Sequence, residues 1–393
     1  MSTRLLRSWF VLLCFTSPAY GQSTSLSKPQ TTFARAQVAR WLTNDRFAVA
    51  RWDGTVTVFR LPSGSAEFGP MLMQALTTPA SKPVEMIGAV SNGAFVTSNG
   101  SSSLAVWTPR NGRYAVKQVL NYPATVGTAN SATPAVLADG TGVFASGHED
   151  GHVLIWGIEK TKLHLLRTVD VKSSNPIPSD FPLKNVRGLA AWRNGYIVTG
   201  SEDGDLTLVR LGDGVIVARL RYSPTARRGI NSISVRGDYL LVATCSVGAE
   251  DRNLWLYRLK SDAIEPLDST NLIAKAGVPQ VFDFDAELFA GLSAPQFVAS
   301  TEEGLLWHGT VTSDKLVVAD KTPVACVGGA AMDVEPASGL IAVAAFDVML
   351  FSAPASAPSD ASPRARDREP SSPSRSQPRL APLELDAKSS GCQ

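Results

Sequence analysis

The sequence is poor in the residues from which catalytic and metal sites are usually built. Its 393 residues include only four histidines and four cysteines, and none of them stands in a C-x-x-C or H-E-x-x-H spacing. Thioredoxin-type chemistry and zinc sites of these two kinds therefore have no support. The chain also lacks a G-x-S-x-G nucleophile elbow and a G-x-x-x-x-G-K-S/T phosphate loop. We therefore predict no catalytic residue, no metal site and no cofactor.

An excess of charge of one sign is also missing, and so is a long apolar run. Lys and Arg number 37 against 35 Asp and Glu, whereas nucleic-acid binding needs clustered basic residues. The N-terminal apolar run from Trp9 to Phe15 is too short to cross a bilayer as a helix. We expect no nucleic-acid partner and no membrane span.

The N-terminus has the pattern of a cleavable signal peptide. Arg4 and Arg7 precede the apolar run, and Ala19-Tyr20-Gly21 supplies small residues at positions −3 and −1 before Gln22. The sequence predicts a signal peptide over residues 1–21 and an exported protein, periplasmic or secreted. A buried N-terminal helix is the alternative interpretation.

Glycine and turn-forming acidic residues recur at a regular spacing. In ASGHEDGHVLIW, Ala145 to Trp156, an Asp-Gly turn joins two β-rich runs, which is a strong hairpin signal. The hairpin returns six more times in looser form, and neighbouring turns are separated by 46, 51, 53, 47, 53 and 43 residues. The positions compared are Gly54, Gly100, Gly151, Gly204, Asp251, Gly304 and Asp347. A period near 40 to 50 residues with four strands per unit is typical of propeller blades.

The repeat predicts an all-β fold, a seven-bladed β-propeller of four-stranded antiparallel blades over residues 22–352. The fourth blade is the clearest, with strands expected at 186–192, 196–200, 205–211 and 215–222. Residues 353–393 are rich in Ser, Pro and Arg and are expected to form a disordered tail. For the last strand of the seventh blade we favour residues 25–33, with 379–385 as the alternative.

The hairpins carry a resemblance to a known family. Asp150 lies six positions before Trp156, and Asp53 and Asp203 lie six positions before Phe59 and Val209. In this spacing the unit resembles a WD-repeat β-propeller. Since the Trp-Asp and Gly-His dipeptides are missing from their usual places, we expect the family's buried His–Ser–Asp–Trp network to be mostly absent. The resemblance further implies that the turns between second and third strands share one face with the connections between blades, and that this face binds partners.

We expect that loop-rich face to bind a protein or peptide. Acidic residues recur in its turns, a Trp takes the same place in the first blade, and long connections add basic and apolar residues. The candidate binding residues are Trp52, Glu149, Glu202, Glu250, Glu302, Phe181, Arg227 and Arg228. Tyr122 is a further candidate apolar anchor.

Two functions remain open. The favoured one is an exported, monomeric, non-enzymatic scaffold for a protein or peptide, and the alternative is a lactonase-like hydrolase or lyase with its site in the central channel. Such enzymes need converging polar residues on the first strands of their blades, and only Asp283 and Asp285 in the sixth blade offer acidic ones in this reading. We interpret that pair as a solvated strand face.

Three cysteines follow the signal peptide. Cys245 and Cys326 lie two blades apart, which is too far for a disulfide. We expect both to be buried and reduced. Cys392 is expected in the tail.

Overall fold

A computed structural model describes residues 33–61, 71–160, 162–177, 183–225, 228–245, 252–273, 285–291, 294–301, 303–324 and 331–352, with the backbone of 381–382. In these ranges the regular structure is β-strand, apart from two short 3-10 turns, η1 (Ser91–Gly93) and η2 (Ala124–Val126). The described part of the chain contains no helix of the length and hydrophobicity needed to span a bilayer. The predicted all-β class is confirmed.

The hairpin that defines the repeat forms as expected. Strand β10 (Gly142–His148) pairs antiparallel with β11 (His152–Glu159), and Phe144 lies opposite Trp156. The turn glycine Gly151 has a φ of 70°, which a residue with a Cβ adopts only under strain. Gly at this turn position also has positive φ in four other blades, at Gly54, Gly100, Gly204 and Gly304.

The strands form seven antiparallel four-stranded sheets, each a blade of consecutive strands. Blade one contains β1 (Ala36–Thr43), β2 (Arg46–Arg51), β3 (Thr55–Arg60) and β4 (Met71–Thr77). Blade two contains β5 (Ile87–Ala89), β6 (Phe95–Ser98), β7 (Ser103–Arg110) and β8 (Arg113–Asn121). Blade three adds β9 (Ala129–Val136) and β12 (Lys162–Asp170) to its hairpin. Blade four contains β13 (Val186–Trp192), β14 (Tyr196–Ser201), β15 (Asp205–Arg210) and β16 (Ile216–Arg221), within one residue of each expected strand boundary.

The remaining three blades follow the same order. Blade five contains β17 (Ile230–Arg236), β18 (Tyr239–Thr244), β19 (Leu254–Leu259) and β20 (Ile264–Thr270). Blade six contains β21 (Asp285–Phe289), β22 (Gln296–Thr301), β23 (Leu305–Thr312) and β24 (Lys315–Pro323). Blade seven contains β25 (Ala331–Val334), β26 (Leu340–Ala344), β27 (Val348–Ser352) and β28 (Ala381–Pro382). The predicted seven-bladed propeller is confirmed.

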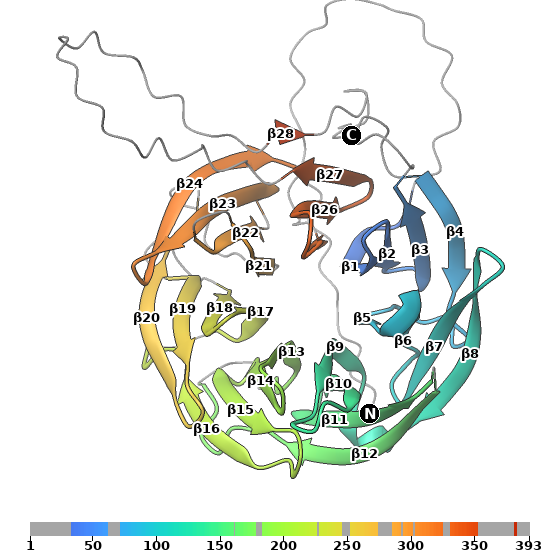
Figure 1. The fold of residues 1–393 in the computed structure, drawn as a ribbon, viewed down its shortest axis with the longest axis horizontal. Helices are drawn as coiled ribbons and strands as arrows, with labels where there is room; N and C mark the ends of the chain where they lie inside the picture. The colour runs from blue at the N-terminus through green and yellow to red at the C-terminus, as the bar shows by residue number, and fades with distance from the viewer. Residues whose placement is uncertain are drawn as a thin grey trace, which may run out of the picture. The chain divides into compact units, whose positions relative to one another are not determined.

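The blades stand around a common centre, with the first strand of each nearest the middle and the fourth at the outside (Figure 1). Burial follows this order. Every residue of the second strand β22 is buried, whereas the outer strand β24 alternates between exposed and half-buried residues. A strand covered on both faces must be apolar throughout, which explains the continuous apolar runs in the sequence.

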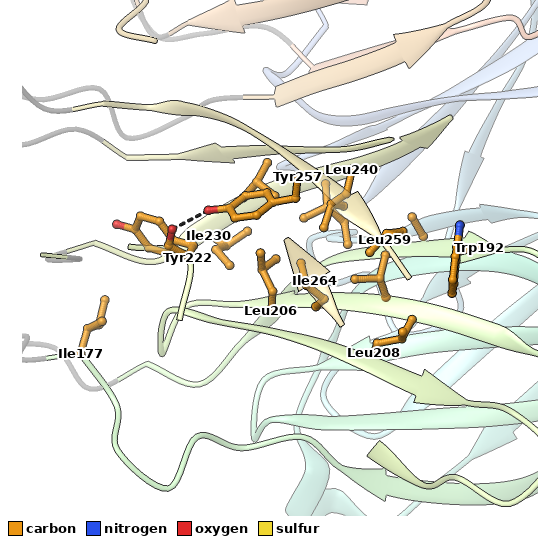
Figure 2. Packing of buried hydrophobic residues seen from close by; sticks show 14 residues of the cluster. Ile177, Trp192, Leu206, Leu208, Tyr222, Ile230, Leu240, Tyr257, Leu259 and Ile264 are labelled. Carbon is orange, nitrogen blue, oxygen red and sulfur yellow. Dashed lines mark hydrogen bonds between the residues drawn. The ribbon is translucent and has the colours of Figure 1, made fainter. Parts of the chain in front are cut away.

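The hydrophobic core is divided among the junctions between blades. Seven clusters of buried residues occur in the described part of the chain, and each joins two neighbouring blades. Figure 2 shows the cluster between blades four and five, where Leu206 and Leu208 of β15 pack against Ile230, Leu240 and other residues of blade five. Face-to-face burial of apolar surface is therefore the main source of stability, at roughly 25 cal/mol per Å².

The ring closes between blades seven and one. The cluster at this junction includes Trp41 and Phe47 from blade one and Ala342 and Leu350 from blade seven. The fourth strand of blade seven is β28, which pairs with β27 through Phe351–Pro382 and Ser352–Ala381. The structure thus assigns the closing strand to the alternative segment. Residues 25–32 of the favoured segment lie outside the described residues, as do residues 1–24 and their predicted signal peptide.

Hydrogen bonds between side chains of the second and third strands recur in three blades. A third-strand indole donates to a second-strand hydroxyl in each: Trp107 to Thr97, Trp156 to Ser146 and Trp255 to Thr244, at 2.9 to 3.1 Å. In blade three Ser146 Oγ also lies 2.8 Å from His148 Nε2. Among the described residues this contact extends to a histidine in blade three alone, which agrees with the expectation that the four-residue network is mostly absent.

Candidate functional site

A cavity of about 330 Å³ lies among the first strands, and all seven of them contribute to its wall. The wall is polar. Its charged residues are Arg35, Arg40, Glu85, Arg187, Asp285 and Glu287. Because these side chains come from blades one, two, four and six, the site exists only when the ring is closed.

One group, the Arg40 cluster, consists of Arg40, Asp285 and Glu287 of the wall and of Asp333, which contacts Arg40 from outside the wall. The Arg40 guanidinium donates to Asp333 Oδ1 at 3.0 Å and lies 3.6 Å from Glu287 Oε1. Asp333 Oδ2 accepts a hydrogen bond from the backbone N–H of Trp41 at 2.6 Å, and Glu287 Oε2 accepts one from the Ser234 hydroxyl at 2.6 Å. A single guanidinium thus faces three carboxyl groups.

Burial makes these carboxyl groups hard to ionise. Loss of water raises the pKa of Asp285 and of Asp333, although the charge of Arg40 opposes the shift. Loss of water, helped by the nearby charge of Asp333, raises the pKa of Glu287 from 4.5 to about 8. The cluster therefore carries a proton at neutral pH in the absence of a further cation.

We expect the free energy of unfolding to fall as the pH rises from about 5 to about 8. In this interval the unfolded chain has already released the proton of Glu287, while the folded chain still holds it, so folding takes up about one proton. Urea unfolding at several pH values measures the slope, and Glu287→Gln should flatten it. The exposed Glu159→Gln is the matched control and should leave the slope unchanged. A slope that persists in Glu287→Gln would contradict the assignment.

A second group, the Arg187 cluster, consists of Glu85, Asn130, Arg187 and Glu202. Arg187 Nε lies 2.6 Å from Glu202 Oε1, and the Asn130 side chain donates to Glu85 Oε2 at 3.1 Å. Burial is the main cause that raises the pKa of Glu85 and of Glu202, with the Glu149 charge adding to both. This group too contains more carboxyl groups than guanidinium groups.

Two of the predicted binding residues, Trp52 and Glu202, are connected to this cavity. Trp52 contributes to the wall, and its side chain is 53% exposed. Glu202 does not line the cavity but forms an ion pair with Arg187, which does. Glu149, in the turn between β10 and β11, accepts a hydrogen bond through Oε2 from the backbone N–H of Thr128 at 2.8 Å. This bond connects the turn to the segment between blades two and three. Arg228 is half-buried, and its carbonyl oxygen accepts from the Tyr222 hydroxyl at 2.8 Å. Phe181, Arg227, Glu250 and Glu302 lie outside the described residues.

The aromatic residues differ from expectation. Tyr122 is buried and packs edge-on against His148, with ring centroids 4.7 Å apart, so it is no exposed anchor. Phe346, in the turn between β26 and β27, is 59% exposed and was not singled out in the sequence. The side chain of the buried Arg51 donates to the carbonyl oxygen of Phe346 at 3.2 Å and so links this turn of blade seven to blade one. Two exposed aromatic side chains therefore occupy corresponding turns of neighbouring blades.

Cys245 is not part of a disulfide, as predicted, but it is half-buried and not buried, and its thiol donates to Asn231 Oδ1 at 3.4 Å. Cys326 and Cys392 lie outside the described residues.

Among solved structures, the chain is similar to the β-propeller domain of Cps50 (Swd1) from Myceliophteria thermophila, with a TM-score of 0.59 and 12% identity over 82% of this chain and 99% of that domain. It is also similar to the WD40 β-propeller domain of Doa1, with a TM-score of 0.57 and 13% identity over 82% of this chain and 94% of that one. No family model matches the sequence. No curated protein matches it either. At these identities the likeness establishes the fold alone, a β-propeller.

Sequence reasoning missed most of the charged cavity wall. The sequence analysis interpreted Asp283 and Asp285 as a solvated strand face. This was wrong for Asp285, which lies in the cavity wall with Glu287. Asp283 lies outside the described residues. It also judged the other first strands to be mainly apolar and so passed over Arg40 and Asp333. The available signal was a single charged residue within an otherwise apolar first strand, in AQVARW and AMDV.

Proposed function

We propose that this propeller is an exported, non-enzymatic scaffold that binds a protein or peptide segment at the end of the ring where Trp52 and Phe346 are exposed. The observation that carries the proposal is the position of Trp52, which is half-exposed and also forms part of the cavity wall. Aromatic anchors beside a pocket dominate the energy of protein interfaces. The WD-repeat resemblance, which implies a partner-binding face at these turns, supports the same conclusion.

The turns that would form this surface are fixed by hydrogen bonds to the connections between blades. One such bond is the Glu149–Thr128 contact described above. Asp203 makes two more: its carboxylate Oδ2 accepts from the backbone N–H of Ser173 at 2.7 Å, and the backbone carbonyl oxygen of Asp203 accepts from the N–H of Ile177 at 3.1 Å. A surface that is already ordered loses little conformational entropy on binding. Such rigidity suits an extended segment laid across several blades.

Selection of peptides from a random display library against the full chain tests this proposal. Selected peptides should lose affinity by about tenfold or more in Trp52→Ala and in Phe346→Ala, since hot-spot aromatics contribute more than 1 kcal/mol each. Leu166→Ala is the matched control, because Leu166 is exposed on the outer strand β12 and should not matter. Affinity that is unchanged in both aromatic variants, or that falls equally in Leu166→Ala, would contradict the proposal.

Export rests on the signal-peptide pattern of residues 1–21. The exported fraction of cells that express the full chain should contain a protein whose N-terminal residue is Gln22. Retention of the whole protein in the cytosol with Met1 attached would contradict this part of the proposal.

The second candidate is a propeller enzyme, such as a lactonase-like hydrolase or a lyase, and Glu287 favours it. A carboxyl group with a pKa near 8 holds a proton at neutral pH and has the property required of a general acid. Turnover of a lactone in a substrate panel, lost in Glu287→Gln, would support this function over the scaffold.

A further inference from the structure

Among the described residues, the cavity wall and the groups paired with it contain more carboxyl groups than guanidinium groups. Its wall contains three arginines and three carboxyl groups. Two of these arginines are already paired with further carboxyl groups, Arg40 with Asp333 and Arg187 with Glu202. The cavity and its paired groups therefore include three positive against five negative ionisable side chains.

The pKa shifts of these carboxyl groups share one direction. Burial raises the pKa of all five carboxyl groups, Glu85, Glu202, Asp285, Glu287 and Asp333. Without an added cation the wall can relieve its repulsion only by binding protons. A positive group placed in the cavity would have the opposite effect and would favour the ionised form of each.

The geometry favours an organic cation over a metal ion. No group of three or more His, Cys, Asp and Glu side chains in the described ranges is arranged to hold a metal. Both oxygens of Asp333 are engaged, by Arg40 and by the N–H of Trp41, and Glu287 Oε2 is engaged by Ser234. A guanidinium or ammonium group spreads its charge over several donors and does not need a compact shell of oxygen ligands.

An independent feature indicates how such a cation would enter. Trp52 lines the cavity and keeps half of its side chain exposed, and the face of an indole attracts cations. At about 330 Å³ the cavity lies at the lower end of the range for ligand pockets. That size suits one long side chain better than a larger ligand.

We propose that this cavity binds a single cationic side chain, arginine or lysine, of the partner segment, between the indole of Trp52 and the carboxyl groups of Asp285 and Glu287. This inference rests on the proposed scaffold function and names the chemistry of the residue that the scaffold recognises. The partner would place this side chain in the cavity while its backbone crosses the surrounding turns.

Saturation-transfer NMR on the full chain, with N-acetyl-arginine amide as the probe, tests the proposal. The probe should receive saturation from the protein, whereas N-acetyl-citrulline amide, its neutral isostere, should not. The double variant Asp285→Asn, Glu287→Gln should weaken binding by about tenfold or more, as expected for loss of charge-assisted hydrogen bonds. Asp262→Asn is the matched control, because Asp262 is an exposed acid outside the cavity wall.

The outcomes separate this inference from the scaffold proposal. Equal signals from the arginine and citrulline probes, or undiminished binding in a folded double variant, would overturn the inference. So would competition by calcium at stoichiometric amounts, which would indicate a metal site. If the double variant fails to fold, the exposed Trp52→Ala takes its place, and undiminished probe binding would then overturn the inference. Selected peptides that depend on Trp52 and Phe346 but contain no essential Arg or Lys would overturn it and leave the scaffold intact.

Discussion

Replacing Trp156 by alanine is expected to lower the free energy of unfolding by about 3 to 5 kcal/mol, the usual cost of removing a large buried aromatic side chain. Trp156 is 1% exposed and packs with Phe144 and Leu154 in the cluster between blades two and three. Its indole N–H also donates to Ser146 Oγ, which contacts His148 in turn. The substitution thus leaves a cavity at a blade junction and an incomplete polar network.

The control for this prediction is another tryptophan. Trp52→Ala removes the same side chain from an exposed turn and should change stability by no more than about 0.5 kcal/mol. Trp156→Phe should lie between the two, because it keeps an aromatic ring but loses the N–H donor. Urea unfolding followed by circular dichroism measures all three. Equal losses in Trp156→Ala and Trp52→Ala would show that the junctions between blades do not determine stability.

Replacing Asp333 by alanine is expected to cost about 2 to 3 kcal/mol, because the half-buried Arg40 loses its charged partner and the N–H of Trp41 loses its acceptor. Asp333 joins the last blade to the first. Its carboxylate accepts from Arg40 and from the N–H of Trp41, and its carbonyl oxygen accepts from the indole N–H of Trp41 at 3.1 Å. The carbonyl contact survives the substitution, so the loss measures the side chain alone.

Two comparisons define the role of Asp333. Asp333→Asn keeps an oxygen for the N–H of Trp41 but not the charge that pairs with Arg40, so it should cost less than the alanine variant. Asp262→Ala, at an exposed position, should stay within about 0.5 kcal/mol of the parent protein. If Asp333→Ala is as stable as Asp262→Ala, then closure of the ring depends on apolar packing at this junction and not on the ion pair.

The hairpins could be predicted because their causes are local. The turn at Gly151 needs a residue that tolerates positive φ, and the strands on either side need apolar side chains. Both requirements are satisfied within about fifteen residues, and a Gly with positive φ occupies this turn in five of the blades. The number of blades then follows from counting the repeats.

The charged wall of the cavity could not be predicted in the same way. Arg40 and Asp333 are 293 residues apart in the chain and 3.0 Å apart in the fold. Nothing in the local sequence of either residue indicates its partner. Phe346 was missed for a related reason, since only the fold shows that its turn lies beside blade one through Arg51.

By itself, the sequence determined the strands, their turns and the sevenfold repeat, because hydrophobic periodicity and turn chemistry act over a few neighbouring residues. Only the tertiary structure decided which charged side chains meet in the centre, which aromatic residues stay exposed and which segment pairs with β27. These properties depend on ring closure, which brings the first and last blades together, and such contacts leave no periodic signal in the sequence.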